Sequence, residues 1–272
     1  MGEGEGRMNF EAFARLHGIL VSGPIVPGKW MRFPTEDHPR TKNGAVKFMG
    51  NVGWVQNHAT QTEPATWFPD STDPCQPIAR RDAMESIRLD QRKAAGKAAW
   101  IIKQGFNSKH PYLEAKGFPD ATGIVWERDG SRLLTIPMRI GRDLVGVQLI
   151  DSHGRKKFLS GQRCSGAEYL IDAKGVDIWC EGYATGLSIR HCLHHLKMRY
   201  RIHITFSAGN LRKMATSGIV VADNDASGTG VEAARATKLR YWVSDVVGED
   251  FNDFWRRVGT FRAGQELAAA MR

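Results

Sequence analysis

The sequence predicts an α/β protein whose C-terminal part is built on a parallel, Rossmann-like sheet, preceded by an α+β subdomain and a small β-rich domain. Two apolar runs near the C-terminus each end in acidic residues and lead into a helical stretch. Two strands joined by a turn come before them, and the amino-terminal part holds short aromatic-rich strands. We therefore divide the chain into a β-rich domain (1–74), a helical linker (75–106), a basic subdomain (107–172) and a C-terminal α/β domain (173–272).

The composition of the chain indicates what kind of partner the protein binds. The 272 residues carry 38 Lys and Arg against 29 Asp and Glu, a net charge of +9, and a basic chain of this size usually meets a polyanion. No apolar run approaches a membrane span and residues 1–7 lack the apolar segment of a signal peptide, so we expect a soluble protein with no membrane partner. The four cysteines are scattered, which suits a reducing cytoplasm and suggests no disulfide framework.

The amino-terminal domain is expected to be a small antiparallel sheet with strands at 29–33, 45–49 and 52–57. No cysteine occurs before Cys75, so no structural zinc is expected there. Trp30 and Trp54, interleaved with Lys and Arg, could form a stacking surface for a single-stranded template. They could equally be the core of the domain, and the core is favoured for any one aromatic because small sheets need large side chains to fold.

A long charged helix is predicted over 78–105, with apolar residues near helical spacing, such as Met84, Ile87, Trp100 and Ile101. It should bridge the two halves of the chain. Its Lys and Arg residues are interpreted as a solvent-exposed face of the helix. The alternative is that they contact a nucleic-acid backbone along the helix.

In the basic subdomain, residues 133–138 and 144–150 read as strands joined by a turn at 139–143. The segment 154–161 (GRKKFLSG) follows and contributes the basic pair Lys156 and Lys157. Such a cluster is often only a solvated hairpin tip. Lysines opposite an acidic metal centre, however, are what a nucleic-acid backbone requires.

The C-terminal domain carries the clearest chemical signal. The runs 176–182 (VDIWCEG) and 219–225 (IVVADND) read as buried parallel strands ending in Glu181 and in Asp223 and Asp225, with helices expected at 185–197 and 230–240. The carboxyl ends of parallel strands meet at one sheet edge, where ligands bind. Clustered carboxylates need a partner to stay ionised, and Mg²⁺ prefers such hard oxygen ligands, so the pattern indicates metal-dependent phosphoryl chemistry. Turn formation and helix capping are the alternative roles of Asp-x-Asp.

These pieces together resemble the Toprim domain, which occurs in DnaG-type primases, topoisomerases and some nucleases. Residues 181–183 (EGY), 207–211 (SAGNL) and 248–253 (GEDFND) are similar to primases of phages and plasmids. The resemblance covers roughly the last hundred residues, and the order of several motifs makes it more specific than any one of them. One departure is Thr185, where many bacterial primases carry a second acid.

The resemblance implies roles for named residues. Glu181, Asp223 and Asp225 would be catalytic, and the same three with Asp250 would hold Mg²⁺ or Mn²⁺; a one-residue slip would bring in Asp253 instead. Lys157, supported by Lys156, Arg132 and Arg139, would face the template or the nucleoside triphosphate.

The function that follows is synthesis of short RNA primers on single-stranded DNA from NTPs, in the cytoplasm of a bacterial host cell. No phosphate-binding P-loop motif is present, so a replicative helicase would be a separate chain. A Toprim nuclease acting on DNA is the first alternative. The second is a non-catalytic module that binds DNA or loads a helicase.

Overall fold

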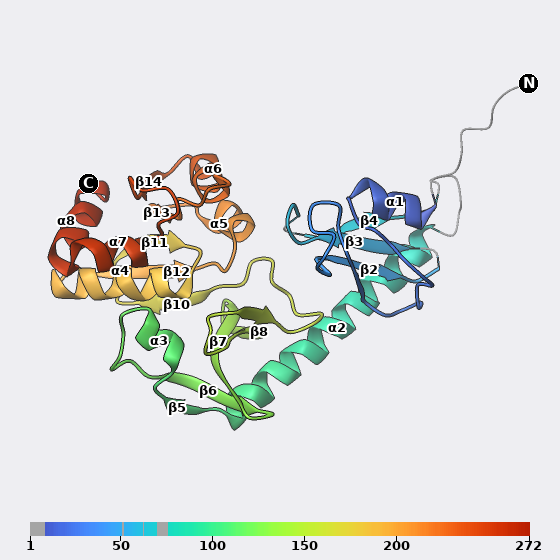
Figure 1. The fold of residues 1–272 in the computed structure, drawn as a ribbon, viewed down its shortest axis with the longest axis horizontal. Coiled ribbons are helices and arrows are strands. Elements are labelled where there is room, and N and C mark those ends of the chain that lie inside the picture. Colours follow the sequence, from blue (N-terminus) through green and yellow to red (C-terminus); the bar gives the residue numbers. More distant parts are fainter. Residues whose placement is uncertain (1–8, 51, 62, 70–75) are drawn as a thin grey trace, which may run out of the picture. The chain divides into compact units, whose positions relative to one another are not determined.

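The computed structural model describes residues 9–50, 52–61, 63–69 and 76–272. The chain forms two compact units, Met1–Leu89 and Asp90–Arg272. Each is described below by itself, with the elements labelled in Figure 1.

The amino-terminal unit contains one four-stranded antiparallel sheet in the order β1-β2-β3-β4. Its elements are α1 (Phe10–Leu16), β1 (Met31–Phe33), β2 (Gly44–Phe48), β3 (Gly53–Asn57) and β4 (Ala65–Trp67). The predicted antiparallel strands are confirmed, and β4 is an additional strand. A side chain at Gly53 would collide with the ring of Phe10, so this glycine lets α1 pack directly on the sheet.

Both predicted stacking tryptophans contribute to packing in this unit. Trp54 is only 5% exposed and forms a small cluster with Val52. Trp30 is partly buried against the same cluster. The ring of Trp54 is therefore a core element in this structure.

Helix α2 (Gln76–Gln104) confirms the predicted linker helix. Ala98 and Ile101 are buried, whereas Trp100 is 52% exposed. Met84, in an early turn of α2, lies outside the residues whose side chains are described. No helix in the described part of the chain combines the length and apolar character needed to cross a membrane.

The second sheet is antiparallel throughout, in the order β5-β6-β7-β8-β9. It contains β5 (Phe106–Ser108), β6 (Gly123–Arg128), β7 (Ser131–Ile140), β8 (Asp143–Ile150) and β9 (Lys156–Phe158), with α3 (Pro111–Ala115) between the first two. The predicted strand pair is β7 and β8, but both are longer than expected, so that only Gly141 and Arg142 remain as the turn. Lys156 and Lys157 lie in the edge strand β9.

The third sheet has the order β10-β12-β11-β13-β14. Its strands are β10 (Tyr169–Asp172), β11 (Val176–Cys180), β12 (Tyr200–Ile204), β13 (Ile219–Ala222) and β14 (Arg240–Val243). Strands β12, β11, β13 and β14 are parallel, which confirms the predicted parallel arrangement of β11 and β13, and β10 pairs antiparallel with β12. Strand β10 thus joins this sheet although its residues precede the boundary placed at 172/173.

The helix predicted over 230–240 is too long. It is α6 (Thr229–Thr237), which ends because Lys238 adopts a left-handed conformation with φ of 60°. Arg240 then begins β14, a strand that the sequence reasoning missed. The other predicted helix is α4 (Tyr183–His195), which starts two residues earlier than expected.

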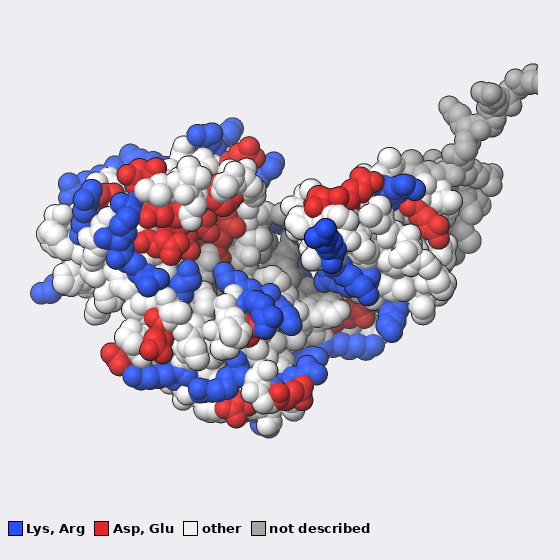
Figure 2. Space-filling model, viewed as in Figure 1, with Lys and Arg blue, Asp and Glu red and all other residues white. Residues whose placement is uncertain are grey.

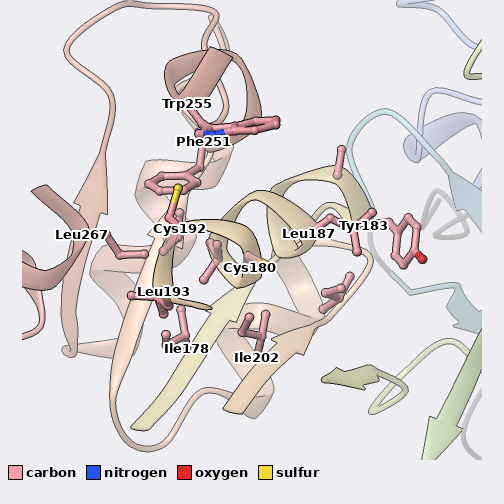
Figure 3. Close-up of a cluster of buried hydrophobic side chains, with 14 of the residues drawn as sticks. Ile178, Cys180, Tyr183, Leu187, Cys192, Leu193, Ile202, Phe251, Trp255 and Leu267 are labelled. Carbon is pink, nitrogen blue, oxygen red and sulfur yellow. The ribbon is translucent and has the colours of Figure 1, made fainter. Parts of the chain in front are cut away.

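The parallel sheet is covered on both faces, as Figure 1 shows. Ile178, Cys180 and Ile202 face α4, α7 (Phe251–Val258) and α8 (Thr260–Ala270), in the apolar cluster drawn in Figure 3. Alternate residues such as Trp179 and Val220 face α5 (Ala208–Met214) and α6. Burial on both sides explains why these strands read as continuous apolar runs.

Candidate acidic active site

Two acidic residues extend from neighbouring strand ends. Glu181 follows β11 and Asp223 follows β13, and these strands are adjacent and parallel, with Ile178 opposite Ile219. The register brings both residues to the same edge of the sheet. Figure 2 shows acidic side chains gathered on this part of the C-terminal unit, with Lys and Arg beside them.

Glu181 is held in a partly buried position. The N–H of Phe206 donates to the Glu181 carbonyl oxygen at 3.0 Å, which ties the strand end to the segment after β12. Burial, and then the charges of Asp223 and Asp225, raise the pKa of the Glu181 carboxyl to about 7. The Ala208 main chain and Lys156 act in the opposite direction. A pKa near neutrality allows this carboxyl to exchange a proton at physiological pH.

Asp223 is in a similar environment. Burial, and then the charge of Asp250, raise the pKa of its carboxyl to about 7, while Lys156 and Lys116 oppose the rise. Its Oδ1 atom is buried and has no hydrogen-bond partner among the described residues. An unpaired buried carboxylate oxygen is costly, so this site gains from a proton or a cation.

Asp225 differs from both. Its Oδ1 accepts from the N–H of Ser227 at 2.8 Å and from the Ser227 hydroxyl, and its Oδ2 accepts from the N–H of Gly230 at 3.2 Å. Partial burial acts to raise the pKa of Asp225, but these hydrogen bonds outweigh it and lower the pKa. Asp225 therefore organises the loop before α6, the capping role that the sequence left as an alternative, while its charge still acts on Glu181 and Asp223.

Asp250 and Asp253 can now be distinguished. The Asp250 carboxylate caps α7 by accepting from the N–H of Asp253 at 2.9 Å. After burial, the charge of Asp250 is the largest influence on the pKa of Asp223, and Asp253 is not one of the main causes. Asp250 is thus the one of the pair whose charge acts strongly on Asp223.

Lys116 is a site residue that the sequence reasoning missed. Its Nζ atom lies 4.0 Å from Asp250 Oδ2 and 3.9 Å from Asp253 Oδ1. The Lys116 carbonyl accepts from the side chain of buried Asn252 at 2.8 Å, and the same amide donates to Ser188 at 2.9 Å. Asn252 therefore ties the segment after α3 to α4 and α7. Only these long-range contacts reveal the role of Lys116, because it is distant from the acids in sequence.

Of the two lysines on β9, Lys156 is the one that acts on the acids, since its charge lowers the pKa of both Glu181 and Asp223. Lys157 is not among those groups, and successive residues of a strand point to opposite faces. Both lysines are exposed.

The two predicted basic-site arginines make local contacts. Arg132 donates to Ser108 Oγ at 2.8 Å and its Nε lies 3.4 Å from Glu127. Arg139 lies at a register shift in β7 and donates to the carbonyl of Arg142 at 2.9 Å.

Several buried polar atoms around the acids lack partners. Of the five buried side-chain N or O atoms without a hydrogen bond among the described residues, four belong to the C-terminal unit: Tyr112 Oη, Thr185 Oγ1, Asp223 Oδ1 and Asn252 Oδ1. Thr185 is 1% exposed in the first turn of α4, directly after Glu181 and Gly182. The Tyr112 hydroxyl is close enough to Asp250 for that charge, after burial, to raise its pKa. Buried polar atoms of this kind usually bond water, an ion or a ligand.

The donor set fits Mg²⁺ held jointly with a substrate. No group of three His, Cys, Asp or Glu side chains within the described ranges is arranged to hold a metal ion by itself. Mg²⁺, however, usually takes only one or two protein carboxylates and completes its shell with water and substrate phosphates. Glu181 and Asp223 match that requirement, since both are partly buried acids whose charged form a cation would stabilise.

No protein-family model matches this chain. Among solved structures, a chain is similar from the complex of bacteriophage T7 lagging-strand DNA polymerase interacting with primase domains of two gp4 subunits bound to an RNA/DNA hybrid and dTTP. The similarity covers 61% of this chain and 91% of that chain, at 13% identity and a TM-score of 0.42. At this level the comparison identifies no family for the chain.

Proposed function

We propose that this protein is a primase-like nucleotidyltransferase with a Toprim-type site, which makes short RNA primers on single-stranded DNA. The observation that carries the proposal is the pair Glu181 and Asp223, which extend from adjacent parallel strands, share one sheet edge and both have a pKa raised to about 7. Each acid is destabilised first by burial and then by its acidic neighbours, a pattern that is common at functional sites.

In this proposal Glu181 and Asp223 bind the divalent cation, with Asp250 beside them and Asp225 holding the loop before α6. A bound Mg²⁺ or Mn²⁺ supplies positive charge to the phosphates during the transfer. Lys156 neutralises part of the triphosphate charge. Glu181 also assists proton transfer from the attacking 3′-hydroxyl. Lys116 keeps Asp250 in place next to Asp223.

The partners proposed are single-stranded DNA, NTPs and a replicative helicase on a separate chain, in the cytoplasm of a bacterial host. A nuclease would use the same carboxylates with water in place of the 3′-hydroxyl, so the two activities are separated by their products. The unpartnered hydroxyl of Thr185, where a second acid is typical, is the one feature that favours a non-catalytic DNA-binding module.

The test is a priming assay with the full-length protein, single-stranded DNA of varied sequence, labelled NTPs and Mg²⁺ or Mn²⁺. The expected products are short labelled oligonucleotides that disappear with EDTA. Cleavage of the template without synthesis would replace the proposal with the nuclease. Retention of DNA with neither product would favour the binding module.

A further inference from the structure

An exposed tryptophan on α2 has no role in the acidic site. Trp100 is 52% exposed, and its ring packs edge-on against Trp126 with a centroid separation of 5.9 Å and an interplanar angle of 81°. Trp126 is itself 6% exposed, so it fixes the Trp100 ring from one side and leaves the other side open. An adjoining side of the helix packs into the unit through Ala98 and Ile101. Exposing a large aromatic surface costs free energy that a bound partner would recover.

Two lysines precede Trp100 on the same side of the helix. Lys93, Lys97 and Trp100 are spaced by four and then three residues, so they lie one above another along the surface. Both lysines are exposed, and neither makes an ion pair or hydrogen bond with a described residue. Their charges are therefore available to an anionic partner.

The acidic residues near this surface are already paired. Asp129 accepts from Arg128 at 2.9 Å, and Glu127 lies 3.4 Å from the Arg132 guanidinium. The guanidinium of Arg128 also lies 6.0 Å above the Trp126 ring. A depression of about 430 Å³ separates the helix from the end of β6; it is lined by Lys97, Trp100, Trp126, Glu127, Arg128 and Asp129. Lys93 and Lys97, beside the open face of Trp100, thus give this surface a net positive charge.

We propose that Lys93, Lys97 and Trp100 form a binding track for single-stranded nucleic acid, in which one base stacks on Trp100 and the two lysines contact backbone phosphates. A helix rises about 1.5 Å per residue, so the lysines stand roughly 6 Å apart and Lys97 roughly 4.5 Å from Trp100, within reach of one or two nucleotides. An isolated aromatic ring among cations suits this ligand, because a strand offers a π-face and a charge in each repeat. A protein partner would instead require a larger interface than one exposed ring and two lysines provide.

The track lies outside the acidic site, and its test does not depend on the proposed function because binding is measured in EDTA and without NTPs. The measurement is the fluorescence anisotropy of a labelled dT20 strand with the full-length protein. Trp100→Ala should weaken binding about tenfold, within the roughly five- to hundredfold range of one lost base stack. The double change Lys93→Ala and Lys97→Ala should weaken binding and reduce the slope of log K against log salt by about 1.4, the value for two single-strand phosphate contacts.

Matched controls separate the track from general surface effects. Phe261→Ala removes another exposed aromatic, 58% exposed on α8, and Lys174→Ala removes another exposed lysine; neither should change the affinity. Trp100→Phe keeps a stacking ring and should restore most of the affinity, which also guards against a folding defect in the alanine variant. A strand carrying 2-aminopurine should lose part of its fluorescence on binding the wild type and regain it with Trp100→Ala.

The proposal is overturned if Trp100→Ala and the double lysine variant bind the strand like the wild type. It is also overturned if these variants lose binding to duplex DNA alone. Loss of self-association in sedimentation, with unchanged strand affinity, would make the surface a contact between copies of this chain and would equally reject the track.

Discussion

Asp223 lies at the end of the strand next to that of Glu181, and its charge adds to burial in raising the pKa of the Glu181 carboxyl to about 7; the pKa of Asp223 is raised to about 7 as well. Among the described residues, neither acid has the ion pair that usually compensates a buried carboxylate. The sheet edge is therefore destabilised by the residues proposed to carry its function, a common property of catalytic sites.

The first prediction concerns stability without metal. The unperturbed pKa values of Glu181 and Asp223 are 4.5 and 3.8, and the folded values are about 7, so between these limits the folded state binds more protons than the unfolded state. The free energy of unfolding of the C-terminal unit should therefore fall as the pH rises from about 4 to above 7. Thermal unfolding in EDTA across this range measures it.

The Asp223→Asn variant tests the cause. By removing one buried charge it should raise the Tm at pH 8 in EDTA, by about 2–4 °C for each 1 kcal/mol relieved, and flatten the pH dependence. Mg²⁺ should stabilise the wild type and not the variant. Asp120→Asn, at a side chain 94% exposed, is the control. A variant less stable than the wild type at pH 8 would show that the Asp223 charge is compensated.

The second prediction separates the two lysines of β9. Lys156→Ala should reduce nucleotidyl transfer by about tenfold or more, because its charge acts on both acids, whereas Lys157→Ala should have a smaller effect. Steady-state priming rates at varied NTP concentration measure the difference. Equal losses, or a larger loss with Lys157→Ala, would contradict this assignment to Lys156. They would favour Lys157 as the residue that faces the template or the nucleoside triphosphate, as the resemblance implies.

The third prediction distinguishes Asp250 from Asp253. Asn is as good an N-cap as Asp, so Asp250→Asn should leave the stability of α7 nearly unchanged while removing the charge next to Asp223. It should lower priming activity at limiting Mg²⁺ more than Asp253→Asn does. If Asp253→Asn is the more damaging change, Asp253 and not Asp250 is the residue of this motif that acts with the strand-end acids.

The fourth prediction concerns Gly230. A β-carbon there would come within 2.5 Å of the Asp223 carbonyl oxygen, a backbone atom that can move only if the strand end or α6 moves. Gly230→Ala should therefore cost about 1–3 kcal/mol and most of the activity. Gly228→Asn is the matched control, because its φ is 72°, nothing lies within 4 Å, and Asn tolerates this conformation. Full activity in Gly230→Ala would show that the Asp223 position is not constrained by this contact.

The parallel strands and their acidic ends were predictable because burial on both faces leaves a continuous apolar run that stops at a polar residue. The site beyond them was not. Lys116 reaches Asp250 only through the packing of α3 against α7, which no local pattern encodes. Strand β14 was missed because a left-handed Lys238, a rare conformation for lysine, ends α6 early. Trp100 fits the apolar periodicity of α2 and yet faces solvent, since Trp126 rather than the core receives its edge.

The most direct measurement is the priming assay with Glu181→Gln and Asp223→Asn beside Asp120→Asn, together with single-strand binding by the same proteins. The geometry predicts that the first two variants lose at least a hundredfold in primer synthesis while binding DNA like the wild type, and that Asp120→Asn keeps both primer synthesis and DNA binding. Primer synthesis retained by Glu181→Gln or Asp223→Asn would contradict the assignment of this sheet edge as the catalytic site.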